Sequence, residues 1–490
     1  MKSTIAISAL WIVLVTMAAR TSAQTNTLYF MENVPSRNML NPAFIPSQSF
    51  YLELPVISGI SVLAGNNSFS LNNLLLSDNG KTITAFHPDA NPDPFLNHLQ
   101  STTNVTEQNR INRFGIGIKV KKNYFTFGIN GQINSNVNVP KGLLSLLLKG
   151  TPDTINTNFF DLHTLGTDES AYLETAFGYA RQVSDKFSIG LKVKALFGQM
   201  HADASFNQFQ LSVNRQIIQL YGSGNAHITT PFDIAQNSDG TPNFSQTDKK
   251  GWGKIVGFGM GFDMGMDYAL TDQIHISGAL TDIGFIHWYK SSWEAQMINT
   301  ISFSGMNVTL NQSNPTFSDQ LGDSVKSAFT YTKNGNGYTT ALAGKFRFGV
   351  DYSVPNEKFN FGILWQNAFG GAALYNDVTV SANFRPFYCF NASLSYSLLN
   401  GNFGTIGLGL NAIAGPVNFF VLTDYLPLYF TKDGYPYKSK YVNVQLGIAL
   451  TFGHKKKADI ARHKQKIEEQ NEENEKKEEP AVSSPPIIMN

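Results

Sequence analysis

The sequence predicts an all-β fold, a transmembrane antiparallel β-barrel of about 14 strands. Apolar and polar residues alternate with a period of two over many segments, which are longer than the roughly 5–6 residues of an average soluble strand. No apolar run beyond residue 23 is long enough for a membrane-spanning helix. Charged residues make up 15% and aromatic residues 12% of the chain, whereas soluble domains are about 25% charged. This composition is typical of a β-rich protein that faces lipid.

Residues 1–23 are predicted to be a secretory signal peptide. Lys2 supplies the positive start, an apolar core runs from Ile5 to Ala19, and Ala23 is the small residue that cleavage requires. A membrane-anchor helix is the alternative interpretation, but the core is shorter than the roughly 18 residues of a membrane span and Arg20 interrupts it. We therefore expect export through the inner membrane and a mature chain that begins at Gln24.

Residues 254–270 show the alternation clearly. The even-numbered positions from Val256 to Leu270 are apolar or aromatic, whereas the odd-numbered positions 257–267 carry only glycine or aspartate. A helix would mix these two sets, so the pattern indicates a strand with one apolar face. The strands predicted in this way are 50–63, 111–121, 124–133, 171–182, 186–198, 254–270, 273–288, 338–354, 358–369, 374–385, 388–398, 402–413, 416–425 and 441–453.

These 14 segments are an even number, which closes a barrel over residues 50–453 with both chain ends on the same side. Short turns alternate with long insertions near 64–112, 134–170, 199–253, 290–337 and 427–440. Residues 203–221 either add a pair of strands or extend strands above the membrane. A soluble β-sandwich also alternates, but apolar faces nearly free of charge, together with the signal peptide, favour a barrel in the cell outer membrane.

Charged residues recur on the faces predicted to line the lumen. They have both signs, so two interpretations stay open: a lining that selects solutes, or ion pairs that lock a plug to the wall. The predicted lumen-facing charges are Lys119, Lys192, Lys194, Asp263, Asp267, Lys345, Arg347, Asp351, Asp377 and Arg385. On the same faces, Gly257, Gly259 and Gly261 are expected to leave room beside the wall for a plug or a solute.

The segment before the first strand carries a recognisable motif. Residues 32–44 read Glu-Asn-Val-Pro-Ser-Arg-Asn-Met-Leu-Asn-Pro-Ala-Phe, with the sequence Asn-Pro-Ala shortly after the predicted cleavage site. This motif resembles a Bacteroidota outer-membrane β-barrel family of unknown function and is similar to barrels of the FadL and PorV type. The resemblance implies a barrel of about 14 strands whose N-terminal segment folds into the lumen as a plug.

A plug over residues 24–49 is also expected on physical grounds. Barrels of about 8 strands are filled by side chains and those of 16–18 strands leave an aqueous channel, so an intermediate barrel needs something in its interior. Asn41-Pro42 favours a turn. The predicted plug residues are Arg37, Asn38, Asn41, Pro42 and Phe44. A simple lead-in to the first strand is the alternative.

No residue pattern predicts catalysis or a cofactor. The single cysteine, Cys389, excludes a disulfide framework within the chain, and the nine histidines show no metal-binding spacing. We therefore expect that the protein is not an enzyme and that it has no metal and no cofactor. A net charge of +1 also argues against a nucleic-acid partner.

Two functions fit this sequence. The first is a FadL-like transport channel for small, hydrophobic solutes. The second is a non-conducting scaffold or partner in an envelope machine for protein export or barrel assembly, with a protein partner bound by the extracellular loops or by the tail. Residues 454–490 form that tail, in which a basic block precedes an acidic block, and such a composition predicts a disordered periplasmic segment. Outer-membrane lipid is an expected partner in both cases.

Overall fold

The computed structural model describes residues 26–55, 59–78, 81–150, 157–214, 217–248, 250–297, 301–304, 329–355, 358–370, 375–399, 403–430 and 436–453. The predicted signal peptide and the charged tail lie outside the described residues.

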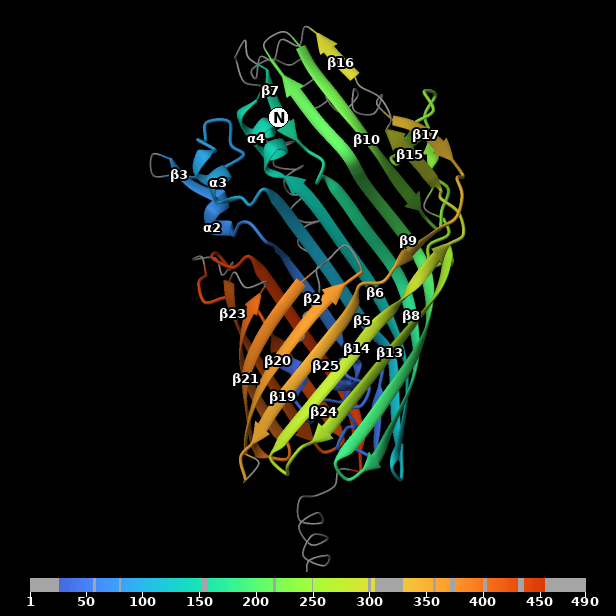
Figure 1. Ribbon diagram of the computed structural model, residues 1–490, viewed down its shortest axis with the longest axis vertical. Coiled ribbons are helices and arrows are strands. Elements are labelled where there is room, and N and C mark those ends of the chain that lie inside the picture. The colour runs from blue at the N-terminus through green and yellow to red at the C-terminus, as the bar shows by residue number, and fades with distance from the viewer. Residues whose placement is uncertain are drawn as a thin grey trace, which may run out of the picture.

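The wall of the barrel consists of 14 antiparallel strands, two of which are interrupted. The wall strands are β1 (Phe50–Glu53) with β2 (Ile60–Asn66), β5 (Thr102–Val120), β6 (Asn123–Pro140), β8 (Gly166–Ser184), β9 (Phe187–Val213), β13 (Gly257–Ala269), β14 (Ile274–Trp288), β18 (Tyr338–Ala341) with β19 (Gly344–Ser353), β20 (Phe359–Phe369), β21 (Tyr375–Phe387), β22 (Phe390–Leu399), β23 (Phe403–Ala414), β24 (Val417–Thr423) and β25 (Tyr441–Phe452). The last strand pairs with the first, through Leu52↔Leu450 and Ile60↔Leu446, so the sheet closes on itself. The predicted 14-stranded barrel is confirmed, and Figure 1 shows its strands side by side in one wall.

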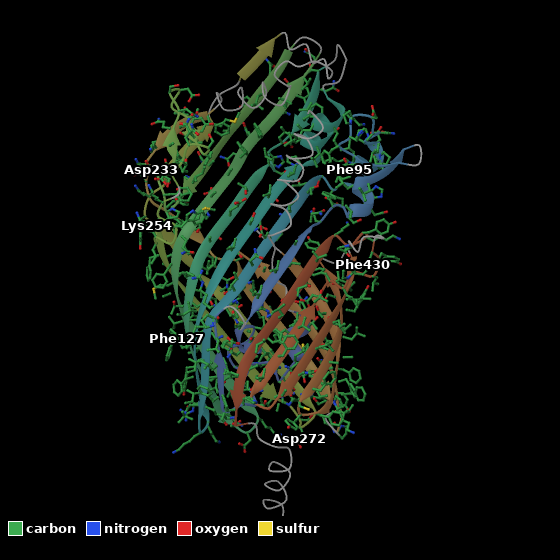
Figure 2. The ribbon with its side chains drawn as sticks, turned by 180° about the vertical axis from the view of Figure 1, so that it is seen from behind. Phe95, Phe127, Asp233, Lys254, Asp272 and Phe430 are labelled. Carbon is green, nitrogen blue, oxygen red and sulfur yellow. The ribbon has the colours of Figure 1, made fainter. Side chains whose placement is uncertain are left out.

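The shorter elements lie at one end of the barrel, where the connections are long (Figure 1). They are α2 (Leu71–Leu74), β3 (Leu75–Asp78), β4 (Lys81–Thr84), α3 (Asp93–His98), α4 (Lys141–Lys149), β7 (Asn158–Asp161), β10 (Ile217–Thr229), β11 (Ala235–Gln236), β12 (Pro242–Asn243), β15 (Trp293–Met297), β16 (Ile301–Ser304) and β17 (Phe329–Lys333). We call this side the long-loop end. At the other end the strands join through tight turns, such as the one at Asp272 (Figure 2).

The wall continues above its predicted limit at the long-loop end. β5, β6, β8 and β9 extend into segments that the sequence analysis assigned to long insertions, and β10 pairs with β9 from Ile218↔Val213 to Thr229↔His201. Residues 203–221 therefore extend the wall. The extensions of β5, β6 and β8 are rich in polar residues on both faces, because a strand outside the lipid needs no apolar face, whereas the extension of β9 places Phe209, Leu211 and Val213 in a buried cluster.

The first strand differs from its predicted course. The segment 50–63 was expected to be continuous, whereas β1 ends at Glu53 and β2 begins at Ile60. Pro55 lies in this interruption, and a proline cannot donate its backbone nitrogen to a central ladder. A second difference occurs at Pro386, where a turn was expected: β21 runs on to Phe387, and its register with β22 shifts between Phe384 and Phe387.

The outer face of the wall is apolar and open to the surroundings. Along β20, Ile363 is 57% exposed whereas the next residue, Leu364, is 1% exposed. The same alternation makes Met260 and Met264 of β13 exposed beside the buried Asp263. Exposed apolar side chains in such numbers are stable only against lipid, so the wall is a transmembrane β-barrel. No helix within the described ranges has the length and apolar character of a membrane span.

Candidate functional site

The N-terminal segment, residues 26–48, packs against the inner face of the wall. It contains two short 3-10 helices, η1 (Thr27–Phe30) and η2 (Pro35–Met39). Its apolar side chains form one buried cluster with three inward residues of β20 and β24. That cluster consists of Leu28, Tyr29, Phe30, Met31, Val34, Leu40 and Phe44 from the segment and Leu364, Phe420 and Leu422 from the wall. Burial stabilises each large apolar side chain by about 1.5–3 kcal/mol.

The start of the segment is anchored by polar contacts. Asp424 accepts hydrogen bonds from the backbone nitrogen and the hydroxyl of Thr27, at 2.7 and 2.6 Å. The amide of Asn26 donates to Thr379 Oγ1 at 3.0 Å and accepts from Gln366 Nε2 at 2.5 Å. Hydrogen bonds that involve a charged group each contribute about 1.5–3 kcal/mol, so Asp424 is a strong attachment point for Thr27.

The Asn-Pro-Ala motif forms a turn that rests on two glycines of the wall. Asn41 Oδ1 accepts the backbone N–H of Ala43 at 2.9 Å, and its amide nitrogen donates to the carbonyl of Met266 at 3.0 Å. A side chain at Gly265 would collide with Asn41, and one at Gly190 would collide with the backbone of Pro42. The wall therefore approaches this turn closely only because these two positions lack a β-carbon.

Arg37 and Asn38 have different surroundings in the segment. The Arg37 guanidinium lies 3.7 Å from the centre of the Phe44 ring, and its Nε donates to the carbonyl of Tyr29 at 2.5 Å. Arg37 thus stabilises the fold of the segment itself. Asn38 faces the wall, since Lys192 Nζ donates to its carbonyl at 2.9 Å and to its Oδ1 at 3.1 Å.

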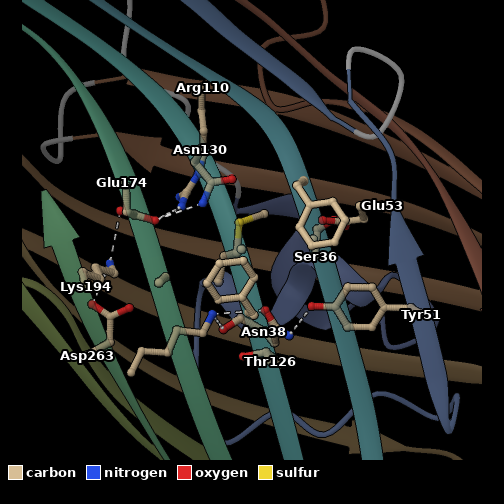
Figure 3. Close-up of a pocket in the computed structure, with 17 residues that line it drawn as sticks. Ser36, Asn38, Tyr51, Glu53, Arg110, Thr126, Asn130, Glu174, Lys194 and Asp263 are labelled. Atoms are coloured by element: carbon tan, nitrogen blue, oxygen red, sulfur yellow. Dashed lines mark hydrogen bonds and ion pairs between the residues drawn. The ribbon is translucent and has the colours of Figure 1, made fainter. Parts of the chain in front are cut away.

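Near Asn38 the wall carries a network of six charges, of which Arg110, Glu174, Lys194 and Asp263 are labelled in Figure 3. Lys194 is its centre, with Nζ 2.7 Å from Asp263 Oδ1, 2.5 Å from Asp282 Oδ1 and 3.7 Å from Glu174 Oε2. Arg110 Nη2 lies 2.8 Å from Glu174 Oε1, and Lys345 Nζ lies 3.0 Å from Asp282 Oδ2. The three cations and three anions balance, so each charge of this network has a partner of opposite sign.

Arg347 and Arg385 join the N-terminal segment to the wall, as Lys192 does through Asn38. Arg347 is buried and its Nη1 lies 3.4 Å from the carbonyl of Leu40. Arg385 forms an ion pair with Glu32. The Lys194 network instead joins wall strands to one another. Neither interpretation described these wall-to-wall pairs, and among the predicted charges that the structure describes the ion pair to the segment is that of Arg385 with Glu32.

The remaining predicted charges lie apart from these contacts. Asp351 and Asp377 are 7% and 1% exposed, and Asp351 Oδ2 accepts from Asn360 Nδ2 at 2.6 Å. Lys119 and Asp267 are partly buried. Gly257, Gly259 and Gly261 make room for wall groups, including the Trp288 ring and the Lys194 side chain, and not for the N-terminal segment.

Three members of the network were missed in the sequence. Arg110 lies one residue before the predicted strand 111–121. Strict alternation does not place Asp282 on the inner face. Its φ of 61° belongs to a bulge that shifts the register between β13 and β14 and brings its side chain to the network. Glu174 could have been predicted, since it lies at the alternate position between Tyr172 and Ala176, and all three residues are buried on the same face of β8.

Little space remains between the N-terminal segment and the wall. One cavity of about 30 Å³ adjoins Ser36, Glu53 and Lys192 (Figure 3), and another of about 70 Å³ adjoins Leu28, Tyr172 and Arg347. A water molecule needs about 10–15 Å³ of such cavity space, so these cavities have room for a few water molecules.

Comparisons with known proteins give one family and several distant structures. The toluene transporter TodX of P. putida aligns over 86% of this chain and 99% of its own, with 10% identity and a TM-score of 0.42. A FadL homologue of Pseudomonas aeruginosa aligns over 89% of this chain and 100% of its own, with 11% identity and a TM-score of 0.40. No curated protein matches the chain. The model of a family of unknown function, DUF5723, matches residues 42–424, and the chain therefore belongs to this family.

Proposed function

We propose that the protein is an outer-membrane channel for small, hydrophobic solutes, with residues 26–44 as a plug that closes its lumen. The observation that carries this proposal is the apolar stripe inside the wall, Leu364, Phe420 and Leu422, which the N-terminal segment covers. A lumen filled with water would be lined by polar groups. An inward apolar stripe is instead suited to contact an apolar solute once the segment has moved.

The attachment of the segment supports a displaceable plug. It is held by apolar contacts and hydrogen bonds, and its ion pair to the wall joins Glu32 to Arg385. The Lys194 network, by contrast, holds wall strands together without contributions from the segment. Displacement of residues 26–44 would therefore leave the charged side of the wall intact and expose the apolar side.

Planar bilayers and liposomes test this function. We expect purified protein to give small or rare current steps, and a variant that lacks residues 26–44 to give large, lasting ones. Liposomes that contain this variant should also take up the hydrophobic dye N-phenylnaphthylamine faster than liposomes with the intact chain. Silent bilayers with both proteins would reject the channel.

A scaffold in an envelope machine is the second candidate, and the long-loop end favours it. A buried apolar cluster there, which includes Leu146, Leu211 and Leu220, gives the raised β9–β10 hairpin a core of its own outside the lipid. A rigid projection of this kind suits a docking role. Affinity capture from native outer membrane, with and without residues 454–490, tests it: stable partners together with silent bilayers would replace the channel by the scaffold.

A further inference from the structure

A third and larger cavity, of about 550 Å³, lies on the inner face of the wall extension at the long-loop end. It is lined by residues of β6, β8, β9, β10 and β18. Four of these strands contribute one row of directly paired positions, Asn136↔Asp168, Asp168↔Asp203 and Asp203↔His227. We call this cavity the mouth site. It is separate from the N-terminal segment, none of whose residues lines it.

The mouth site has an excess of negative charge. Asp168 and Asp203 are direct cross-strand neighbours, an arrangement that is unfavourable for like charges. No lysine or arginine is among the lining residues. The Asp203 carboxylate has His227 Nδ1 at 3.2 Å and His201 Nδ1 at 3.5 Å, whereas the Asp168 side chain has no hydrogen bond or ion pair with any residue that the structure describes. A cation between the two carboxylates would remove this repulsion.

Aromatic rings adjoin the carboxylates in the lining of the mouth site. The His227 ring stacks on Tyr338 with a centroid distance of 4.8 Å. Tyr338 is held in place, since its hydroxyl lies 2.8 Å from His201 Nδ1 and 3.0 Å from Thr229 Oγ1. Phe206 adds an apolar surface to the lining. Such rings bind flat or apolar groups and also attract cations over their faces.

We propose that the mouth site binds a small organic amine, with its ammonium group between Asp168 and Asp203 and its aromatic or apolar body against Tyr338 and Phe206. The cavity is much larger than a metal ion, and the described residues contain no group of three or more potential ligands placed for a metal. The aromatic wall would have no role with a metal. Binding here does not require conduction, so it can be tested whether or not the channel proposal holds.

Matched ligands test the proposal. Isothermal titration of the full-length protein in detergent at neutral pH compares 2-phenylethylamine with 2-phenylethanol, which has the same ring and no charge. We expect the amine to bind and the alcohol to bind at least about tenfold more weakly, because hydrogen bonds to charged groups are the stronger ones. Asp168→Asn and Asp203→Asn should each weaken amine binding by about tenfold or more.

Glu169→Gln is the control, because Glu169 is the next residue on β8 and faces the other side of the strand, where Ser135 Oγ donates to it at 3.3 Å. This variant should bind the amine as the natural chain does. Circular dichroism and heat-modified mobility on gels confirm that each variant is folded. Equal binding of amine and alcohol, or unchanged amine binding in both aspartate variants, would overturn the proposal. Stoichiometric Ca²⁺ binding that displaces the amine would assign the site to a metal instead.

Discussion

Lys194 of β9 and Asp263 of β13 form a buried ion pair across neighbouring strands, with Nζ 2.7 Å from Oδ1 and both side chains at most 4% exposed. The two residues are not directly opposite each other in the ladder between β9 and β13, where Lys194 pairs with Gly261 and Asp263 pairs with Lys192. The diagonal contact allows one ammonium group to reach Asp263, Asp282 and Glu174 together. Lys194 is thus the cation on which one side of the lumen depends.

Replacement of Lys194 by methionine should destabilise the barrel strongly. The change leaves three carboxylates without their shared cation, and breaking a buried ion pair costs about 3–5 kcal/mol. Urea unfolding in detergent measures the loss. Lys122→Met is the control, because Lys122 is 59% exposed at a turn and exposed pairs contribute about 0–1 kcal/mol. Equal midpoints for the two variants would contradict the role of Lys194.

Replacement of Gly265 by alanine should loosen the N-terminal segment. The added methyl group would collide with Asn41 and push the Asn-Pro-Ala turn away from the wall. We expect more frequent current steps in planar bilayers. Gly261→Ala lies on the same face of β13, where a methyl group would meet Lys194 at an ordinary contact distance of 3.4 Å. If Gly261→Ala gave current steps as often as Gly265→Ala, the contact of the Asn-Pro-Ala turn with the wall would not be what keeps the channel closed.

Replacement of Asp424 by leucine should release the start of the segment. Thr27 would lose both of its hydrogen bonds to the carboxylate, of which each contributes about 1.5–3 kcal/mol. Limited trypsin digestion measures the release as cleavage after Arg37, which is followed by mass spectrometry. Asp233→Leu serves for comparison, since the Asp233 side chain is 76% exposed in a loop. Resistance of Arg37 to cleavage in both variants would argue against Asp424 as an anchor.

Amine binding at the mouth site should weaken as the pH falls through about 6. Burial, followed by the nearby carboxylates of Asp203 and Glu169, raises the pKa of Asp168 from 3.8 to about 6. Asp168 is therefore charged at neutral pH and becomes neutral below about pH 6, where it no longer attracts an ammonium group. Burial lowers the pKa of His201 to about 4, so His201 stays neutral over this range.

The pH dependence is measured by titration of 2-phenylethylamine between neutral and mildly acidic pH. Asp203 on β9, His227 on β10 and Tyr338 on β18 also face Asp168. The Asp168→Asn variant separates the contribution of these groups from that of Asp168, because its residual amine binding should change less between the two pH values than binding to the natural chain does. An equally steep change in Asp168→Asn would attribute the dependence to another group.

The strand pattern was predictable because lipid imposes it. Every predicted strand has a counterpart in the wall, since a period of two with one apolar face is required wherever the chain crosses the membrane. Above the membrane the requirement ends, so the extensions of β5, β6 and β8 carry no apolar face and fall in the segments predicted as long insertions. The interruption at Pro55 is a local backbone effect that a face pattern does not register.

The candidate sites were less predictable, because side-chain partners depend on register. The alternation of side chains along each strand places Lys194 and Asp263 on the inner face. The bulge at Asp282 adds a third charge, which strict alternation does not predict. The mouth site arises from a row across four strands, which no local stretch of sequence contains. The Asn-Pro-Ala motif pointed to the N-terminal segment, yet its glycine cradle at Gly190 and Gly265 comes from distant strands.

Spin labels at two adjacent positions test the central claim, a barrel with an apolar outside and a filled inside. Nitroxides at Ile363 and Leu364, in a chain with Cys389→Ser, are compared in lipid vesicles for collisions with oxygen and with a water-soluble nickel chelate. The label at Ile363 should collide mainly with oxygen, as in lipid, and the label at Leu364 should be immobilised and shielded from both. Strong nickel collisions at Ile363 would place that face in water and contradict the transmembrane barrel.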